Sequence, residues 1–284
     1  MEVRRASAPH FYSGDCARTT ERFVQGFVAP PQPAQVFGGI VPHAGWQYSG
    51  AVAAKVFETI RQKADPATFV IFGAVHRWAG INSVYARGAW ATPLGAAEID
   101  EPLAAKILEE TPKWTVDDPR AHSGEHSIEV ELPFIKHFFP QAKVIPIAVN
   151  PDTRAVPLGR RVGKILKELA PGAIVIGSSD LTHYGDAYGF TPARYGPQAH
   201  QWMKENDARI LRLAEEMKAS EITEEAQYRQ NACGAGAIAA TVAAALALGA
   251  QRGYLLEYTT SYDVVPEGEF QMAVGYAGLL FGEA

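Results

Sequence analysis

Cysteine is scarce in this sequence, which has only Cys16 and Cys233 among its 284 residues. Two thiols cannot supply the several disulfides on which small secreted domains depend, so the composition predicts a reducing, cytoplasmic setting. Basic residues are scattered, and 26 lysines and arginines stand against 31 acidic residues, which gives a formal net charge of −5. Without a basic stripe the chain lacks the surface that binds a phosphate backbone, which argues against a nucleic acid partner.

Long apolar runs are absent as well. The longest, residues 237–250, is rich in alanine and contains Thr241 and Gly249. It is shorter than the ~20 apolar residues of a membrane span, so we expect a buried helix and no membrane partner. The N-terminal residues, Met-Glu-Val-Arg-Arg, are not followed by an apolar stretch, so the sequence predicts no secretory signal.

Three glycine-containing motifs are also missing. The chain has neither the dinucleotide-binding fingerprint nor the Walker pattern of nucleotide hydrolases. It has no Gly-x-Ser-x-Gly elbow either, which argues against a serine hydrolase.

The sequence does contain apolar runs that alternate with helical patterns. We expect core strands at residues 36–41, 69–72, 144–149 and 174–177. Continuous apolarity is typical of parallel strands that are covered on both faces, so the alternation predicts an α/β fold with a mainly parallel sheet between helices.

Other segments complete this prediction. A helix is expected from Ser123 onward, with His126 in its first turn. Two last strands, residues 254–260 and 272–280, are expected to pair antiparallel at a sheet edge. The chain has no internal repeat and no long linker, so we expect a single domain that comprises residues 1–284.

Histidines follow three of the expected strands. His43, His76 and His183 each lie just beyond the carboxyl end of an apolar run. The carboxyl ends of parallel strands meet at one rim of a sheet, so we expect these side chains to share one site. Imidazole is the commonest neutral ligand of zinc, iron and copper. The alternative for each is a hydrogen-bonded loop histidine.

The remaining candidates each have two interpretations. Cys233 precedes a helix, whose N-terminus would lower the pKa of the thiol and favour a role as a metal ligand or nucleophile. Alternatively, Cys233 is a small buried apolar residue, which is the role that we expect for Cys16. Asp180 could orient an imidazole such as that of His183, which could itself transfer protons, or it could cap a following helix. For His126 a surface or capping role is favoured over a place at the rim.

Together these residues resemble the Memo family, known in prokaryotes as AmmeMemoRadiSam system protein B. The matching segments are Pro42-His43-Ala44-Gly45 with Tyr48 and Gly50, the strand that leads into His76, Glu125-His126-Ser127-Ile128-Glu129 with Leu132-Pro133, Ser178-Ser179-Asp180 with His183, and Cys233-Gly234. The family is similar to class III extradiol dioxygenases of the protocatechuate 4,5-dioxygenase type. The resemblance implies a three-layer α/β/α sandwich with a mostly parallel central sheet.

The resemblance also implies a metal centre. His43, His76 and Cys233 would surround the metal, with His183 and Asp180 as catalytic residues alongside. The related dioxygenase site uses two histidines and a glutamate, so a cysteine makes this site softer. We expect Fe(II), with Cu or Zn as alternatives. Arg77 stands where the family commonly has a second histidine, and this cation near the rim could favour an anionic ligand.

Three functions remain open on this basis. The first is a metal-dependent redox or dioxygenase-type enzyme that acts on an unknown small molecule or modified residue. The second is a non-catalytic protein that binds a peptide or a metal in the same cleft, lined by Trp46, Tyr48, Trp78 and Tyr184. The third is a zinc hydrolase. The prokaryotic family name further implies a radical-SAM protein and an AMMECR1-like protein as partners.

Overall fold

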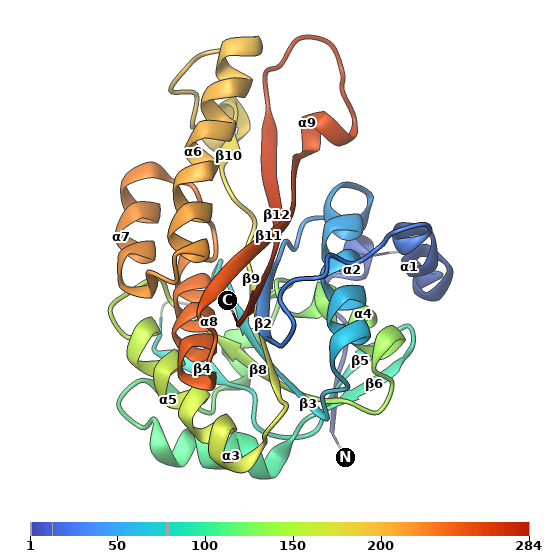
Figure 1. Cartoon of the computed structure of the whole chain (residues 1–284), viewed down its shortest axis with the longest axis vertical. Coiled ribbons are helices and arrows are strands. Elements are labelled where there is room, and N and C mark those ends of the chain that lie inside the picture. Colours follow the sequence, from blue (N-terminus) through green and yellow to red (C-terminus); the bar gives the residue numbers. More distant parts are fainter. Residues whose placement is uncertain (1, 13, 78–79, 284) are drawn as a thin grey trace.

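A mixed β-sheet runs through the molecule, with helices on both of its faces (Figure 1). The computed structural model describes residues 2–12, 14–77 and 80–283. Within this part of the chain the sheet consists of nine strands: β2 (Val36–Val41), β3 (Thr68–Gly73), β4 (Asn82–Val84), β7 (Thr115–Val116), β8 (Lys143–Ala148), β9 (Ile174–Ser178), β10 (His183–Tyr184), β11 (Arg252–Thr260) and β12 (Ala273–Gly282).

The strands follow the order β10-β12-β2-β9-β3-β8-β4-β7, and β11 pairs with β12. The four central strands, β2, β9, β3 and β8, are parallel to one another. β12 and β4 flank them in antiparallel orientation. The predicted α/β fold is confirmed, with the parallel pairs concentrated at the centre of a mixed sheet. The four expected core strands are β2, β3, β8 and β9, and the expected antiparallel pair is β11 and β12.

Helices cover the two faces of this sheet. One face carries α1 (Cys16–Val24), α2 (Trp46–Lys63) and α4 (Leu132–Phe138), and the other carries α5 (Ala155–Leu169), α6 (Pro197–Glu215), α7 (Ala219–Arg229) and α8 (Ala235–Leu248) (Figure 1). The smaller elements are α3 (Glu101–Glu110), α9 (Ser261–Val264), the 3₁₀ turns η1 (Pro9–Phe11), η2 (Pro119–His122), η3 (Glu129–Glu131) and η4 (Asp186–Tyr188), and a second sheet of β1 (Val3–Arg4), β5 (Ala89–Thr92) and β6 (Gly95–Glu98). The predicted three-layer α/β/α architecture is therefore confirmed.

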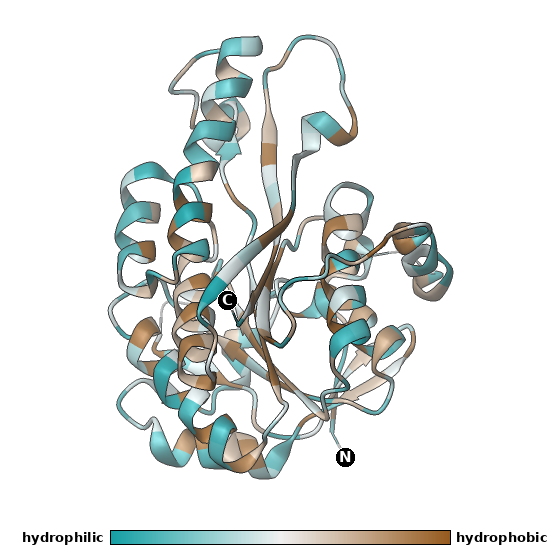
Figure 2. Ribbon diagram, viewed as in Figure 1, coloured by the Kyte–Doolittle hydropathy of each residue, from teal (hydrophilic) through white to brown (hydrophobic). Residues whose placement is uncertain are grey.

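Apolar residues concentrate on the central strands and on the inward faces of the helices (Figure 2). α8 is the alanine-rich helix that the sequence predicts as buried, and small residues let α5 approach it closely. A Cβ added at Gly159 of α5 would lie 2.0 Å from the carbonyl oxygen of Ala240 in α8. Among the described residues, no helix is both long and apolar enough to cross a bilayer.

The predicted helix from Ser123 is wrong in its first half. Turns and η3 occupy this stretch, and α4 begins only at Leu132. Pro133 stands in the first turn of α4, where its missing N–H leaves no hydrogen bond unmade. His126 therefore lies in a turn before the helix, which frees its side chain to face the end of the sheet.

Candidate metal centre

A cavity of about 760 Å³ opens beyond the carboxyl ends of the central parallel strands. His43 follows β2, His76 follows β3 and Asp180 follows β9, and all three line the cavity together with His183. The prediction that the three strand-end histidines share one rim is confirmed. Their chemical roles remain predictions.

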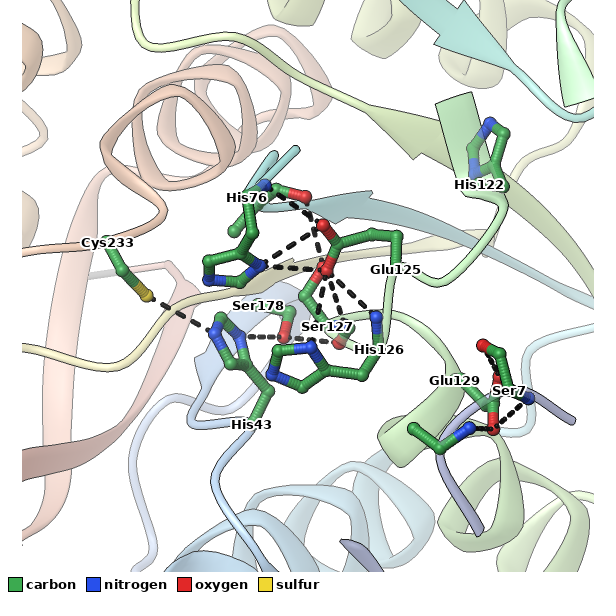
Figure 3. A network of polar contacts seen from close by, with 12 residues as sticks. Ser7, His43, His76, His122, Glu125, His126, Ser127, Glu129, Ser178 and Cys233 are labelled. Carbon is green, nitrogen blue, oxygen red and sulfur yellow. Dashed lines mark hydrogen bonds and ion pairs between the residues drawn. The ribbon is translucent and has the colours of Figure 1, made fainter. Parts of the chain in front are cut away.

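The imidazole of His43 is buried and has a defined tautomer. Its Nδ1 lies 2.9 Å from the Oγ of Ser178, and this hydroxyl donates to the carbonyl of Ser127 at 2.6 Å (Figure 3). Because the Ser178 proton is already used, Nδ1–H of His43 must be the donor and the lone pair lies on Nε2. Burial, aided by the nearby His126, lowers the pKa of His43 well below its usual value, so the ring is neutral.

His76 is held by a carboxylate. Both oxygens of Glu125 lie within 3.1 Å of Nδ1 of His76, and the backbone N–H of His76 donates to the same carboxylate (Figure 3). Burial opposes charge on His76, but Glu125 outweighs it and raises the pKa of the imidazole. Burial alone would raise the pKa of Glu125, yet His76 and the N–H of Ser127 bring it below the usual range.

Asp180 braces the backbone beside His43. Its Oδ1 accepts hydrogen bonds from the N–H groups of His43 at 2.7 Å and Ala44 at 3.2 Å. Burial raises the pKa of Asp180 to about 7 in spite of these bonds. The ring of His183, which we expected Asp180 to orient, is fixed instead by the carbonyl of Leu181, 3.0 Å from Nδ1. The alternative of a helix cap is wrong, because β10 follows Asp180.

Cys233 reaches the site from the turn before α8. Its Sγ lies 3.2 Å from Nε2 of His43 (Figure 3). Burial raises the pKa of the Cys233 thiol, and the charge of Asp180 adds to this. The predicted helix-terminal lowering of the thiol pKa is therefore wrong for the free thiol, because desolvation dominates. Cys16 is buried in α1, as expected.

The sequence favours a surface or capping role for His126 over a place at the rim, and this prediction is wrong. It lines the cavity, and its ring stacks on that of His76 with centroids 4.9 Å apart. The ring of Phe11 lies on it at 4.4 Å. The sequence predicts no separate role for Glu125 either, although the adjacent Glu125-His126 pair is a signal that indicates one.

The four aromatic residues expected to line the cleft have different positions. Tyr48 lines the cavity. Trp46 is buried and stacks on Phe134 with centroids 4.0 Å apart, and Tyr184 is buried in a separate cluster near Phe270. Trp78 lies outside the described residues.

The donor set suits a transition metal. One ligand atom from each of His43, His76 and Cys233 lies within 4.8 Å of the others. The Nδ1 atoms of both histidines are engaged by neighbouring groups, which leaves Nε2 for a ligand, as is usual for metal-binding histidines. His76, Glu125 and His126 form a second such group, but four hydrogen bonds to Glu125 favour a supporting role for this carboxylate.

A match to a family model along nearly the whole chain identifies the family of this protein. Residues 4–280 match the model of the family described as Memo-like protein. The chain belongs to the Memo family.

Individual relatives agree with this assignment. A MEMO1 family protein of Thermococcus kodakarensis is 34% identical over 97% of this chain and 98% of its own length. A MEMO1 family protein of Methanosarcina acetivorans is 35% identical over 99% of each chain. Among solved structures, an uncharacterized Escherichia coli K12 protein, JW3007, has a TM-score of 0.51, with 11% identity over 87% of this chain and 100% of that chain. This last likeness concerns the fold alone.

Proposed function

We propose that this Memo family protein is a metal-dependent enzyme of the oxidoreductase type that acts on a small molecule in the cavity. The observation that carries the proposal is the convergence of His43, His76 and Cys233, which offer donor atoms within 4.8 Å of one another. Of these three residues, His43 and His76 line the cavity. A hydrogen-bonding partner fixes each of the two rings at Nδ1.

Fe(II) is the proposed metal, on the resemblance to dioxygenase sites that use two histidines, and Cu or Zn are alternatives that the thiolate of Cys233 suits. Two imidazoles and one thiolate form a softer set than the oxygen donors that Mg and Ca prefer. When bound, such an ion supplies Lewis acidity and, in the case of iron or copper, one-electron chemistry. Three protein donors beside a cavity leave space for a substrate.

His183 is the proposed acid or base. Its Nδ1–H donates to the carbonyl of Leu181, so Nε2 carries a lone pair in a side chain that lines the cavity. Burial lowers the pKa of His183, which keeps the ring neutral and able to take a proton from a hydroxyl group. Asp180 contributes by fixing the backbone of His43.

The test is oxygen consumption by Fe(II)-loaded protein in the presence of catechols, with metal-free protein beside it. We expect turnover to require the metal and to fall by roughly 100-fold or more in His183→Gln, which keeps its metal content. His137→Gln, on the far end of α4 and outside the cavity lining, is the matched control and should retain wild-type turnover. Turnover that is unchanged in His183→Gln, or equal without metal, contradicts the proposal.

A further inference from the structure

Among the described residues that line the cavity, all of the Asp, Glu, Lys and Arg side chains are acidic. Asp180, Glu267 and Glu269 line it, and the described residues of its lining include no lysine or arginine. Arg77, which is predicted from the sequence to be a cation near the rim, is exposed and is not among these residues. Fixed negative charge in a cleft with low-dielectric walls attracts cations and repels anions.

Two of the carboxylates stand at the mouth without partners. Glu267 and Glu269 lie in the segment between α9 and β12, and both are exposed. Within the described part of the chain neither forms an ion pair or hydrogen bond. Some acidic residues elsewhere on the surface are paired, as Asp152 is with Arg154 at the start of α5 and Glu225 is with Arg209 between α7 and α6. The charges at the mouth are therefore not neutralised by the fold.

A third carboxylate lies deeper in the wall. Asp180 is only 4% exposed, and both of its hydrogen bonds from the backbone end on Oδ1. Its Oδ2 receives no hydrogen bond from any described residue. Because Asp180 lines the cavity, this oxygen is an acceptor for an N–H or O–H group of a molecule bound there.

Aromatic rings form much of the remaining wall. Tyr48 and Tyr188 line the cavity with 37% and 44% exposure, and Phe11 and Tyr276 lie beside them. The faces of aromatic rings attract organic cations and also contact apolar carbon. A volume of about 760 Å³ is within the range for small-molecule sites.

We infer that the substrate is a small organic cation that carries a protonated amine, which is attracted by Glu267 and Glu269 and packs against the tyrosines. The inference rests on the proposed function, because it concerns the same cavity. This inference is the opposite of the prediction from the sequence, in which Arg77 near the rim favours an anionic ligand. An amine supplies the N–H donors that the carboxylates lack, whereas a carboxylate or phosphate would meet like charge.

The experiment compares three catechols of different charge: dopamine, catechol and protocatechuate. Their binding is measured anaerobically by calorimetry, with metal-free protein and with Zn-loaded protein, at low and high salt. We expect dopamine to bind about tenfold more tightly than protocatechuate at low salt, and the difference to shrink at high salt. The preference should be present without metal, because it comes from the carboxylates.

Two double variants test whether Glu267 and Glu269 cause the preference for dopamine. Glu267→Gln/Glu269→Gln should weaken dopamine binding by about threefold for each carboxylate removed. Glu168→Gln/Glu224→Gln removes the same charge from exposed positions on α5 and α7 and should leave binding unchanged.

The inference is overturned if protocatechuate binds as well as dopamine, if dopamine does not bind, or if the mouth variant keeps wild-type affinity. Metal content of the same samples separates this outcome from a failure of the proposed function. Protein that takes up metal but prefers the acid refutes the inference alone. Protein that prefers the amine but cannot be loaded with Fe, Cu or Zn refutes the proposed function alone.

Discussion

Glu125→Gln is the substitution that most sharply tests how the candidate metal centre is held. The Glu125 carboxylate is 5% exposed and accepts hydrogen bonds from the backbone N–H and Nδ1 of His76, and from the backbone N–H groups of His126 and Ser127, all at 2.9–3.1 Å. A glutamine has the same shape, but only one of its two terminal atoms can accept. Its amide nitrogen would face N–H donors that no longer have an acceptor.

The expected loss has two parts. Hydrogen bonds to a charged group contribute about 1.5–3 kcal/mol each, so the loss of roughly two of them should lower the free energy of unfolding by about 3–6 kcal/mol. Release of Nδ1 also frees the ring of His76 to rotate and lowers its basicity. The loss of such a partner typically weakens metal binding by about 10–100-fold.

Two assays separate these effects. Urea denaturation of metal-free protein gives the free energy of unfolding, and competition with a chelator gives the metal affinity. Glu129→Gln is the control, because Glu129 is an equally buried carboxylate that binds Arg4 and the N–H groups of Ser7 and Ala8, away from His76. It should lose stability but keep metal affinity. Wild-type metal affinity in Glu125→Gln, or an equal loss in both variants, would refute the reasoning.

Three further predictions concern other parts of the molecule. Burial lowers the pKa of His122 from 6.5 to about 4, so the unfolded chain takes up the proton first as the pH falls, and the folded protein should lose up to about 3 kcal/mol of stability between pH 6.5 and 4. Urea denaturation at several pH values measures this loss, which should be absent in His122→Phe. The same dependence of stability on pH in wild type and variant would contradict this prediction. Cys233→Ser should abolish metal binding while Cys16→Ala, in the buried face of α1, keeps it at a cost of about 1 kcal/mol in stability; equal metal contents would show that neither thiol is a ligand. Gly159→Ala should lower the free energy of unfolding by about 1–3 kcal/mol, because the added methyl group meets the backbone of α8. At an exposed helix glycine the same substitution usually raises Tm. A rise in the Tm of Gly159→Ala would therefore show that α5 and α8 can separate without cost.

The core strands could be predicted because the apolar residues within each strand indicate its burial directly. β2 and β9 are covered by helices on both faces, so almost every position is apolar, and their limits are visible without tertiary information. The positions of His43 and His76 followed from the same strands, since a parallel sheet brings the residues after its strands to one edge.

The parts that were missed depend on contacts between distant segments. Glu125 and His76 are 49 residues apart, and nothing local indicates that one binds the other. The apolar spacing after Ser123 imitates a helix, which concealed the turn that brings His126 into the cavity. Trp46 follows a strand end, as a cleft residue would, but its ring stacks on Phe134 in the core instead.

Metal analysis of protein purified without oxygen is the most direct test of the central claim. We expect stoichiometric iron or copper in the wild type, and its loss without unfolding in His43→Ala and Cys233→Ser. His137→Ala, whose ring lies outside the cavity lining, should keep the metal. A folded wild-type protein that contains no metal and cannot be loaded with Fe, Cu or Zn would contradict the account.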